Sequence, residues 1–262
     1  MTRPQELPLA SFYQGRILNL AHRGAREQAP ENTIPAFEKA AELGADGVEL
    51  DVQLTADGVP VVFHDRAVER LTGGVGYLTE MTLSQVKALD AGSRFSPRFA
   101  ATRIPTLDEV FEELGDRLLF NIELKSLSAH SRGLEHAVVQ SIQRHDMADR
   151  VVISSFNLLS LRHVRRLAPG LALGCLYYAP GLPQPLSKGW LARPIIGRHE
   201  AHHPHFSIVN GAYMRWARQH RYRVNVWTVN EPEDIQRMRD LGVDAIMSDR
   251  PDLVQDVLQG EL

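Results

Sequence analysis

The chain has 262 residues, of which 44% are hydrophobic and 23% charged, and its formal net charge is −3. This is the composition of a globular protein with one large core, and so small a charge favours neither a nucleic-acid partner nor an anionic membrane surface. A single cysteine, Cys175, excludes an intrachain disulfide and a cysteine-rich zinc site, and no stretch approaches the roughly 18 apolar residues of a membrane span. We therefore expect a cytoplasmic protein, and the sequence leaves its oligomeric state open.

Short β-rich runs recur along the chain, and most are followed by a stretch with helical spacing. After a first strand at residues 17–21, a helix is expected over 33–43, with Asn32 or Thr33 as its cap and Gly44 at its end. Further helices are expected over 133–144, after the cap Asn157, and over 232–241. The other predicted strands are residues 47–54, 118–124, 151–154, 171–178, 206–209, 223–229 and 245–247.

Alternating strands and helices predict a parallel sheet, and eight such units predict a closed (β/α)₈ TIM barrel. The alternative, an open doubly wound sheet, would normally carry a glycine-rich phosphate loop after its first strand. This chain has His22-Arg23-Gly24-Ala25 at that place, which favours the barrel. We expect a single domain over residues 1–262.

A long connection, residues 55–117, separates the second and third predicted strands. Its expected parts are an apolar strand at 59–63, a glycine-rich turn at 73–76, and helical pieces at 83–89 and 107–114. Insertions of this length in a compact domain usually have a function, such as forming a wall of a site.

Two of the predicted strands alternate between apolar and polar residues. Because the outer face of a barrel packs against helices, their polar side chains are expected to point inward, near the carboxyl ends of the strands where active sites of this fold lie. The inward set is Glu49, Asp51 and Gln53 from the second strand, and Asn121, Glu123 and Lys125 from the third.

Three inward carboxylates cannot easily stay ionised together without a compensating cation. One divalent ion would resolve the conflict, and hard oxygen ligands favour Mg²⁺ or Ca²⁺. A solvated edge strand also produces such alternation, and for one strand alone it would be about as good an interpretation. Two strands of this kind in a β/α context favour a metal site formed by Glu49, Asp51 and Glu123.

Two histidines stand at strand ends near these acids. His22 and Arg23 follow the first strand, and His64 ends the apolar run 59–63. Each histidine alone is more often structural, but together they offer two imidazoles beside a metal and the fixed cations Arg23 and Lys125. Hydrolysis of a phosphodiester requires this set, because charge on the phosphate must be neutralised while protons move to and from its oxygens.

The chain resembles the glycerophosphodiester phosphodiesterase family over nearly its whole length. The residues that carry the resemblance are, in order, Ala21-His22-Arg23-Gly24, Pro30-Glu31-Asn32-Thr33, Glu49-Leu50-Asp51-Val52, Val62-Phe63-His64-Asp65, Ile104-Pro105-Thr106-Leu107, Asn121-Ile122-Glu123-Leu124-Lys125 and Val226-Trp227-Thr228-Val229-Asn230. The resemblance implies a barrel enzyme that acts on a small glycerophosphodiester and releases glycerol 3-phosphate and an alcohol. It also implies that Glu49, Asp51 and Glu123 bind the metal, that His22 and His64 form the acid–base pair, and that Arg23 and Lys125 hold phosphate.

Other candidates have weaker signals. If Trp227 points inward, it could form an apolar wall for the glycerol, although a role as barrel filling is at least as good an interpretation. The histidines at 199, 202, 203 and 205 are expected in the loop leading into the sixth strand, with one imidazole lining the substrate pocket, rather than in a metal site. The glycine-rich turn at 73–76 follows no strand-to-helix junction, so we expect a turn and not a phosphate loop.

Two other functions fit the same residues. A lysophospholipase D-type enzyme would act on a substrate with one acyl chain, but no amphipathic membrane-binding helix is evident. A non-catalytic barrel that binds a phosphate ester would be stabilised by its ligand without releasing product. The complete set of acid–base and metal-ligating residues favours hydrolysis.

Overall fold

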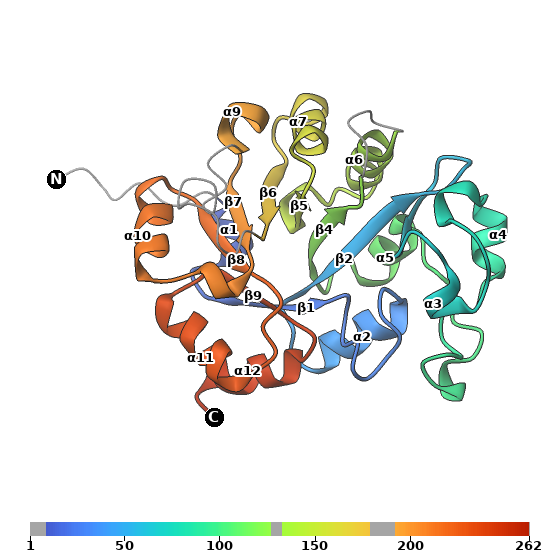
Figure 1. Ribbon diagram of the computed structural model, residues 1–262, viewed down its shortest axis with the longest axis horizontal. Helices are drawn as coiled ribbons and strands as arrows, with labels where there is room; N and C mark the ends of the chain where they lie inside the picture. The colour runs from blue at the N-terminus through green and yellow to red at the C-terminus, as the bar shows by residue number, and fades with distance from the viewer. Residues whose placement is uncertain (1–8, 127–132, 179–191, 262) are drawn as a thin grey trace.

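The computed structural model describes residues 9–126, 133–178 and 192–261. Eight parallel strands close into a barrel, which Figure 1 shows as a ring of arrows at the centre of the molecule. The strands of the ring, in the order in which they pair, are β1 (Leu18–His22), β2 (Gly47–Leu54), β4 (Leu119–Leu124), β5 (Val151–Ser155), β6 (Ala172–Tyr177), β7 (Ala201–Pro204), β8 (Arg223–Val226) and β9 (Ala245–Ser248). Because β1 pairs with both β9 and β2, the ring is closed, and the predicted TIM barrel is confirmed.

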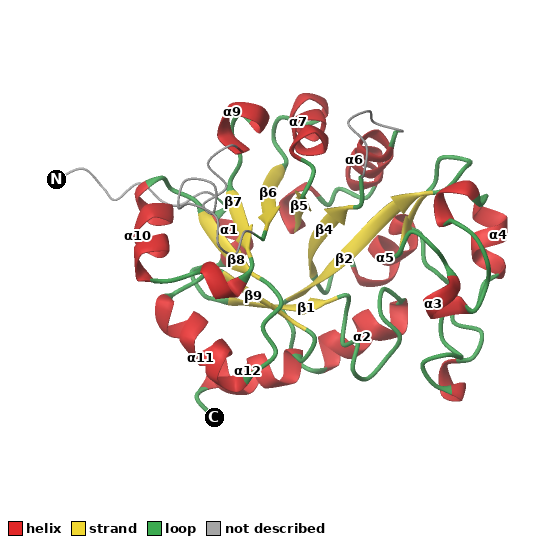
Figure 2. Ribbon diagram, in the orientation of Figure 1, coloured by secondary structure: helices red, strands yellow, loops and turns green. Residues whose placement is uncertain are grey.

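Helices surround this ring, as Figure 2 shows. They are α2 (Ile34–Glu42), α5 (Leu107–Leu114), α6 (Leu134–Arg144), α7 (Leu158–Leu167), α9 (Ala192–Ile196), α10 (Gly211–Gln219), α11 (Pro232–Leu241) and α12 (Pro251–Gln259). A short helix, α1 (Ala10–Tyr13), precedes the barrel, and 3₁₀ turns occur at Ala148–Arg150 and Phe206–Ile208. No helix among the described residues has the length and apolar character needed to cross a bilayer.

The alternation of β2 places its two sets of side chains as expected. Val48, Leu50 and Val52 belong to one buried apolar cluster with Phe37 of α2 and Val110 of α5, so this face lies between the strand and the helices. The alternate residues therefore face the inside of the barrel. Cys175 of β6 is buried in the same cluster, as expected for a small hydrophobic side chain.

The predicted helix ends at Gly44, Asn157 and Gly242 are confirmed, and the predicted cap of α2 is confirmed in position but not in its side-chain bond. The side chain of Asn157 caps α7 by accepting from the Leu159 N–H at 3.1 Å, and Gly242 ends α11 at φ 68°. At the start of α2, Thr33 occupies the cap position, but neither its side chain nor that of Asn32 caps the helix. The amide of Asn32 instead donates to Asp51 Oδ2 at 2.8 Å, so it is not available to cap the helix.

The sixth barrel strand lies earlier in the chain than expected. Residues 206–209 were predicted as this strand because they are apolar, but Phe206–Ile208 is a 3₁₀ turn and β7 is Ala201–Pro204. His202 and His203 are therefore strand residues, and the expectation that they lie in the preceding loop is wrong. Both are buried, and burial lowers the pKa of each ring, so neutral histidines fill positions where the sequence pattern calls for apolar residues.

The insertion between β2 and β4 protrudes to one side of the ring in Figure 1. It contains β3 (Pro60–Val62), antiparallel to the end of β2, then α3 (Glu69–Thr72), a 3₁₀ turn at Leu78–Glu80, α4 (Leu83–Ala88) and a 3₁₀ turn at Pro97–Phe99. A small apolar cluster of its own, which includes Phe63, Leu78 and Ile104, holds these pieces together. The last helical piece of the predicted insertion is α5, which packs in the main apolar cluster and is the ordinary crossover helix of the barrel.

Candidate active site

Three carboxylates meet at the carboxyl end of the barrel. The register of β2 and β4 pairs Asp51 with Glu123 and Glu49 with Asn121. Asp51 and Glu123 are therefore direct neighbours across the two strands, and Glu49 lies two residues before Asp51 on the same face. Each of Glu49, Asp51 and Glu123 offers an oxygen that lies within 4.8 Å of those of the other two. Within residues 9–126, 133–178 and 192–261, this is the only group of three or more His, Cys, Asp or Glu side chains so close together.

Burial and mutual repulsion make it costly to ionise all three acids. Burial raises the pKa of Glu49 well above its usual value, and the nearby Asp51 and Glu123 raise it further. Burial and Asp51 likewise raise the pKa of Glu123, to about 7. Asp51 is different, because Lys125, Arg23 and His64 outweigh its burial and lower its pKa. A divalent cation bound to the three oxygens would remove this conflict, so the donor set fits a hard metal ion.

Two cations flank the acids. Lys125 Nζ lies 2.9 Å from Glu123 Oε1 and 3.4 Å from Asp51 Oδ1. Arg23 Nε lies 3.3 Å from Asp51 Oδ2, yet this buried nitrogen has no hydrogen-bond partner among the described residues. Arg23 has the left-handed φ of 60°, and its backbone N–H donates to the Glu49 carbonyl at 2.9 Å. Its side chain therefore starts at the end of β1, beside Glu49 of β2, and reaches the acids.

Glu31 holds three guanidinium groups around the site. This buried carboxylate accepts from Arg23 at 3.0 Å and from Arg70 at 2.7 Å, and it lies 2.8 Å from Arg26. The three arginines outweigh the effect of its burial, so the pKa of Glu31 is lowered. Because one ionised acid binds all three, Glu31 fixes the position of Arg23 beside Asp51.

His22 is oriented by an acid at the end of the last strand. Its Nδ1 lies 2.6 Å from Asp249 Oδ1, and the other oxygen of Asp249 accepts from the Asn230 amide at 2.9 Å. The second ring nitrogen, Nε2, lies 3.9 Å from Glu49 Oε2. Asp249 therefore fixes the ring so that Nε2 faces the acidic cluster.

His64 is held in a similar way from the insertion. Its Nδ1 lies 2.7 Å from Asp65 Oδ1, and the other oxygen of Asp65 forms an ion pair with Arg70. The Gln53 amide donates to the backbone carbonyls of Phe63 and Asp65, at 2.8 and 2.7 Å, and so ties the residues on either side of His64 to β2. Burial lowers the pKa of His64, although Asp51 opposes this effect.

A cavity of about 140 Å³ lies between these groups. His22, Arg23, Glu49, His64, Glu123 and Lys125 line one part, and Phe156, Leu176, Trp227 and Met247 line another. Trp227 thus points into the site, where its Nε1 donates to the His203 carbonyl at 2.7 Å and its ring packs edge-on against Phe156 at 5.6 Å. The cavity combines two imidazoles, two cations and an acidic cluster with an apolar wall, which suits proton transfer at a phosphate ester.

The four histidines in and around β7, at positions 199, 202, 203 and 205, lie elsewhere. His199 Nε2 is 3.1 Å from His202 Nε2, and His202 Nδ1 is 3.2 Å from the Tyr177 hydroxyl, next to α10. None of the four histidines is among the described residues that line the cavity, although the His205 ring contacts Trp227 at 5.3 Å. The turn at 73–76 also stays outside the site, with the Gly76 N–H bonded to Glu69.

Asp249, Asn230 and Glu31 contribute to the site, although the sequence analysis assigned none of them a role. Asp249 and Asn230 are polar residues that follow the strands β9 and β8, and this position signals the active-site end of a barrel. Glu31 stands in a motif of the family resemblance, but its position in the loop before α2 did not indicate that it binds two arginines of the same loop and Arg70 of the insertion.

Known proteins resemble this chain over almost its full length. The family model described as "Glycerophosphoryl diester phosphodiesterase family" matches residues 22–253. A glycerophosphodiester phosphodiesterase of Caldanaerobacter subterraneus is 44% identical over 238 residues, which are 90% of this chain and 96% of that protein. A glycerophosphodiester phosphodiesterase of Bacillus subtilis is 33% identical, over 94% of this chain and 87% of its own length.

Solved structures of similar fold point to the same family. A phosphodiesterase of Oleispira antarctica, solved in complex with the product sn-glycerol-3-phosphate, matches with a TM-score of 0.82 and 31% identity, over 94% of this chain and 98% of that one. A protein from Silicibacter pomeroyi described as a putative glycerophosphoryl diester phosphodiesterase matches with a TM-score of 0.84 and 30% identity, over 98% of both chains. With this extent of agreement in sequence and fold, the chain belongs to the glycerophosphoryl diester phosphodiesterase family.

Proposed function

We propose that this protein hydrolyses glycerophosphodiesters to glycerol 3-phosphate and an alcohol, and that it needs a divalent cation to do so. The observation that carries the proposal is that Glu49, Asp51 and Glu123 lie close together, and that Glu49 and Glu123 line one cavity with His22 and His64. Membership of the family supports it, and so does the product bound to the Oleispira antarctica relative.

Glu49, Asp51 and Glu123 are the proposed metal ligands. Their close oxygens and the raised pKa values of the two glutamates support this assignment, because a divalent cation such as Mg²⁺ or Ca²⁺ would balance the charge of the ionised acids. When bound, such an ion polarises a phosphoryl oxygen and neutralises its charge. Arg23 and Lys125, which flank the same acids, would hold the remaining charge of the phosphate.

His22 and His64 are the proposed acid–base pair. Each has its Nδ1 beside an aspartate, so its Nε2 is the nitrogen left to exchange a proton with the substrate. The reaction consumes one water overall. One imidazole takes a proton from the attacking oxygen, and the other protonates the departing alkoxide. Trp227 and the neighbouring Phe156 supply the apolar wall against which the carbon chain of the glycerol would pack.

The proposal is tested by a coupled assay for glycerol 3-phosphate on the purified chain. Glycerophosphocholine is assayed with excess chelator and then with Mg²⁺ or Ca²⁺ added back. We expect no release with chelator and recovery with at least one of the two ions. Release that is complete in metal-free protein would overturn the metal role. Comparison with the monoacyl form of the same substrate separates this activity from that of a lysophospholipase D.

A further inference from the structure

The catalytic cavity is too small for a whole glycerophosphodiester. Its volume of about 140 Å³ is well below the roughly 300–1,000 Å³ of most small-molecule pockets. The phosphate and the proposed glycerol position already use it, because the cations and the apolar wall both line it. The leaving alcohol must therefore lie in an adjoining space.

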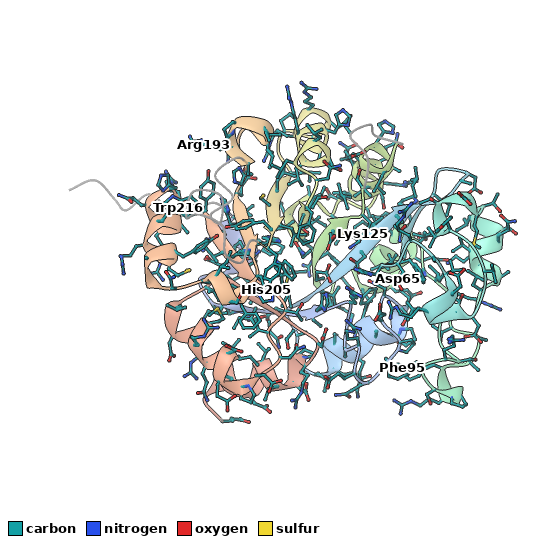
Figure 3. The ribbon with its side chains drawn as sticks, viewed as in Figure 1. Asp65, Phe95, Lys125, Arg193, His205 and Trp216 are labelled. Carbon is teal, nitrogen blue, oxygen red and sulfur yellow. The ribbon has the colours of Figure 1, made fainter. Side chains whose placement is uncertain are left out.

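Such a space lies on the side of the insertion. A hollow of about 580 Å³ shares His64 and Lys125 with the catalytic cavity. A second hollow of about 540 Å³ continues it, and Gln53, Arg66 and Lys125 line both. We call these two hollows the outer groove; Asp65 and Lys125, labelled in Figure 3, mark the side of the barrel on which it lies.

Within the part of the chain that the structure describes, the charges along the outer groove are in ion pairs, except for those of Arg66 and Glu69. Arg70 pairs with Asp65, and Lys125 pairs with Asp51 and Glu123. No ion pair of Arg66 occurs among the described residues, and its guanidinium lies 5.6 Å from the centre of the Tyr77 ring. Glu69 lines the first hollow, where its carboxylate accepts from the Gly76 N–H, but no described carboxylate lines the second.

Arg66 is also held in place. The Arg66 carbonyl accepts from the Leu78 N–H at 2.9 Å, and Ala67 forms a bridge with Tyr77, the residue whose ring lies beside the guanidinium. An arginine whose backbone is held and whose guanidinium lies over an aromatic ring loses less freedom when it binds a ligand. Its planar array of donors suits a phosphate or carboxylate, and its positive charge repels a quaternary ammonium group.

We propose that the outer groove binds the leaving alcohol and that Arg66 selects alcohols that carry an anionic group, such as a phosphate monoester. This specificity rests on the proposed hydrolysis, since it concerns the second half of the same substrate. The preferred substrates are then glycerophosphodiesters of phosphorylated alcohols, and choline esters are poorer ones.

The test compares two substrates that differ in one phosphate. They are glycerophosphoglycerol and the same diester with a phosphate on the leaving glycerol, assayed with saturating metal in the wild type, Arg66→Ala and Arg66→Lys. We expect the wild type to have the higher kcat/KM for the phosphorylated substrate. Arg66→Ala should lower this preference about tenfold, mainly through KM, because one charge-assisted contact is lost. Arg66→Lys should retain part of it, and salt should weaken it.

Arg162→Ala is the matched control, because it removes an exposed arginine from α7 and changes the net charge equally. It should leave both kcat/KM values unchanged. If Arg66→Ala left the ratio of the two kcat/KM values unchanged, whether or not both values fell, the role of Arg66 would be overturned. The hydrolysis itself would remain in place. A wild-type protein that cleaves neither substrate would overturn the proposed function and this inference together.

Discussion

Two groups of buried titratable side chains lie in this barrel, and they have opposite characters. At the carboxyl end, Glu49, Asp51 and Glu123 crowd together with raised pKa values on the two glutamates. Beside α10, His199 and His202 form a chain in which ring nitrogens and hydroxyls pair with one another. The charge of the acids is not fully balanced by the side chains around them, whereas the ring nitrogens of the two histidines all have hydrogen-bond partners.

The histidine chain can be satisfied by neutral rings alone. His199 Nδ1 lies 3.3 Å from the Gly197 carbonyl, so it donates there and leaves Nε2 to accept from His202. His202 Nδ1 then accepts from Tyr177, which in turn is bonded to Tyr213. Burial lowers the pKa of His202 well below its usual value, consistent with a neutral ring. The comparison shows that clustered histidines indicate a site only when their nitrogens lack partners.

The largest effect is expected from removing either imidazole of the acidic site. His22→Ala and His64→Ala should each lower kcat roughly 10²- to 10⁴-fold, because positioned proton transfer contributes that much. His136→Ala, which removes an exposed histidine from α6, is the control and should keep full activity. Circular dichroism checks that all three variants fold. Near-normal turnover in His22→Ala and His64→Ala would exclude the acid–base pair.

A smaller loss is expected from the acid that orients His22. Asp249→Asn keeps the shape of the side chain but removes the charge beside Nδ1, so kcat should fall roughly 10- to 100-fold with a changed pH profile. Asp240→Asn, on the exposed end of α11, should have no effect on either. If Asp249→Asn changed KM alone, Asp249 would not act through His22.

A substitution in the histidine chain should lower the stability of the protein and leave its activity unchanged. His202→Ala removes a buried ring and leaves the Tyr177 hydroxyl without its acceptor, so the free energy of unfolding should fall by roughly 2–4 kcal/mol. The value of kcat/KM should stay within about twofold of wild type, since His202 lies outside the catalytic cavity. Urea denaturation and the glycerol 3-phosphate assay measure the two quantities. A loss of activity in folded protein would contradict the contrast between the two groups.

The smallest effect concerns pH and the metal. In metal-free protein the pKa of Glu123 is about 7, above its value in an unfolded chain, so the folded state binds more protons between the two values. The stability of metal-free protein should therefore fall as pH rises from about 4.5 to 7. Added Mg²⁺ or Ca²⁺ should raise Tm more at pH 7.5 than at pH 5, and Glu123→Gln should reduce this difference. An equal shift at both pH values would argue against the acids as ligands.

The sequence predicted much of this arrangement because strand alternation is a local property. Glu49, Asp51 and Glu123 point inward since their neighbours Leu50 and Ile122 pack outward, and that pattern is visible in the chain. The sixth strand was misplaced because buried histidines occupy positions where apolar residues are expected.

Partnerships between distant segments were not predictable in the same way. Asn32 shows this, since a residue with the properties of a helix cap is bonded to Asp51 instead. The contact of Glu31 with Arg70 likewise depends on how the insertion folds over the first loop.

Anomalous diffraction from crystals soaked in Mn²⁺, an octahedral oxygen-binding ion that can replace Mg²⁺, most directly tests whether the three acids hold one cation. We predict a single strong peak among the oxygens of Glu49, Asp51 and Glu123, at roughly 2.0–2.6 Å from each. The peak should be lost in Asp51→Asn and kept in Asp240→Asn. A wild-type crystal with no peak at this position, or with the carboxylates turned away from one another, would contradict the account.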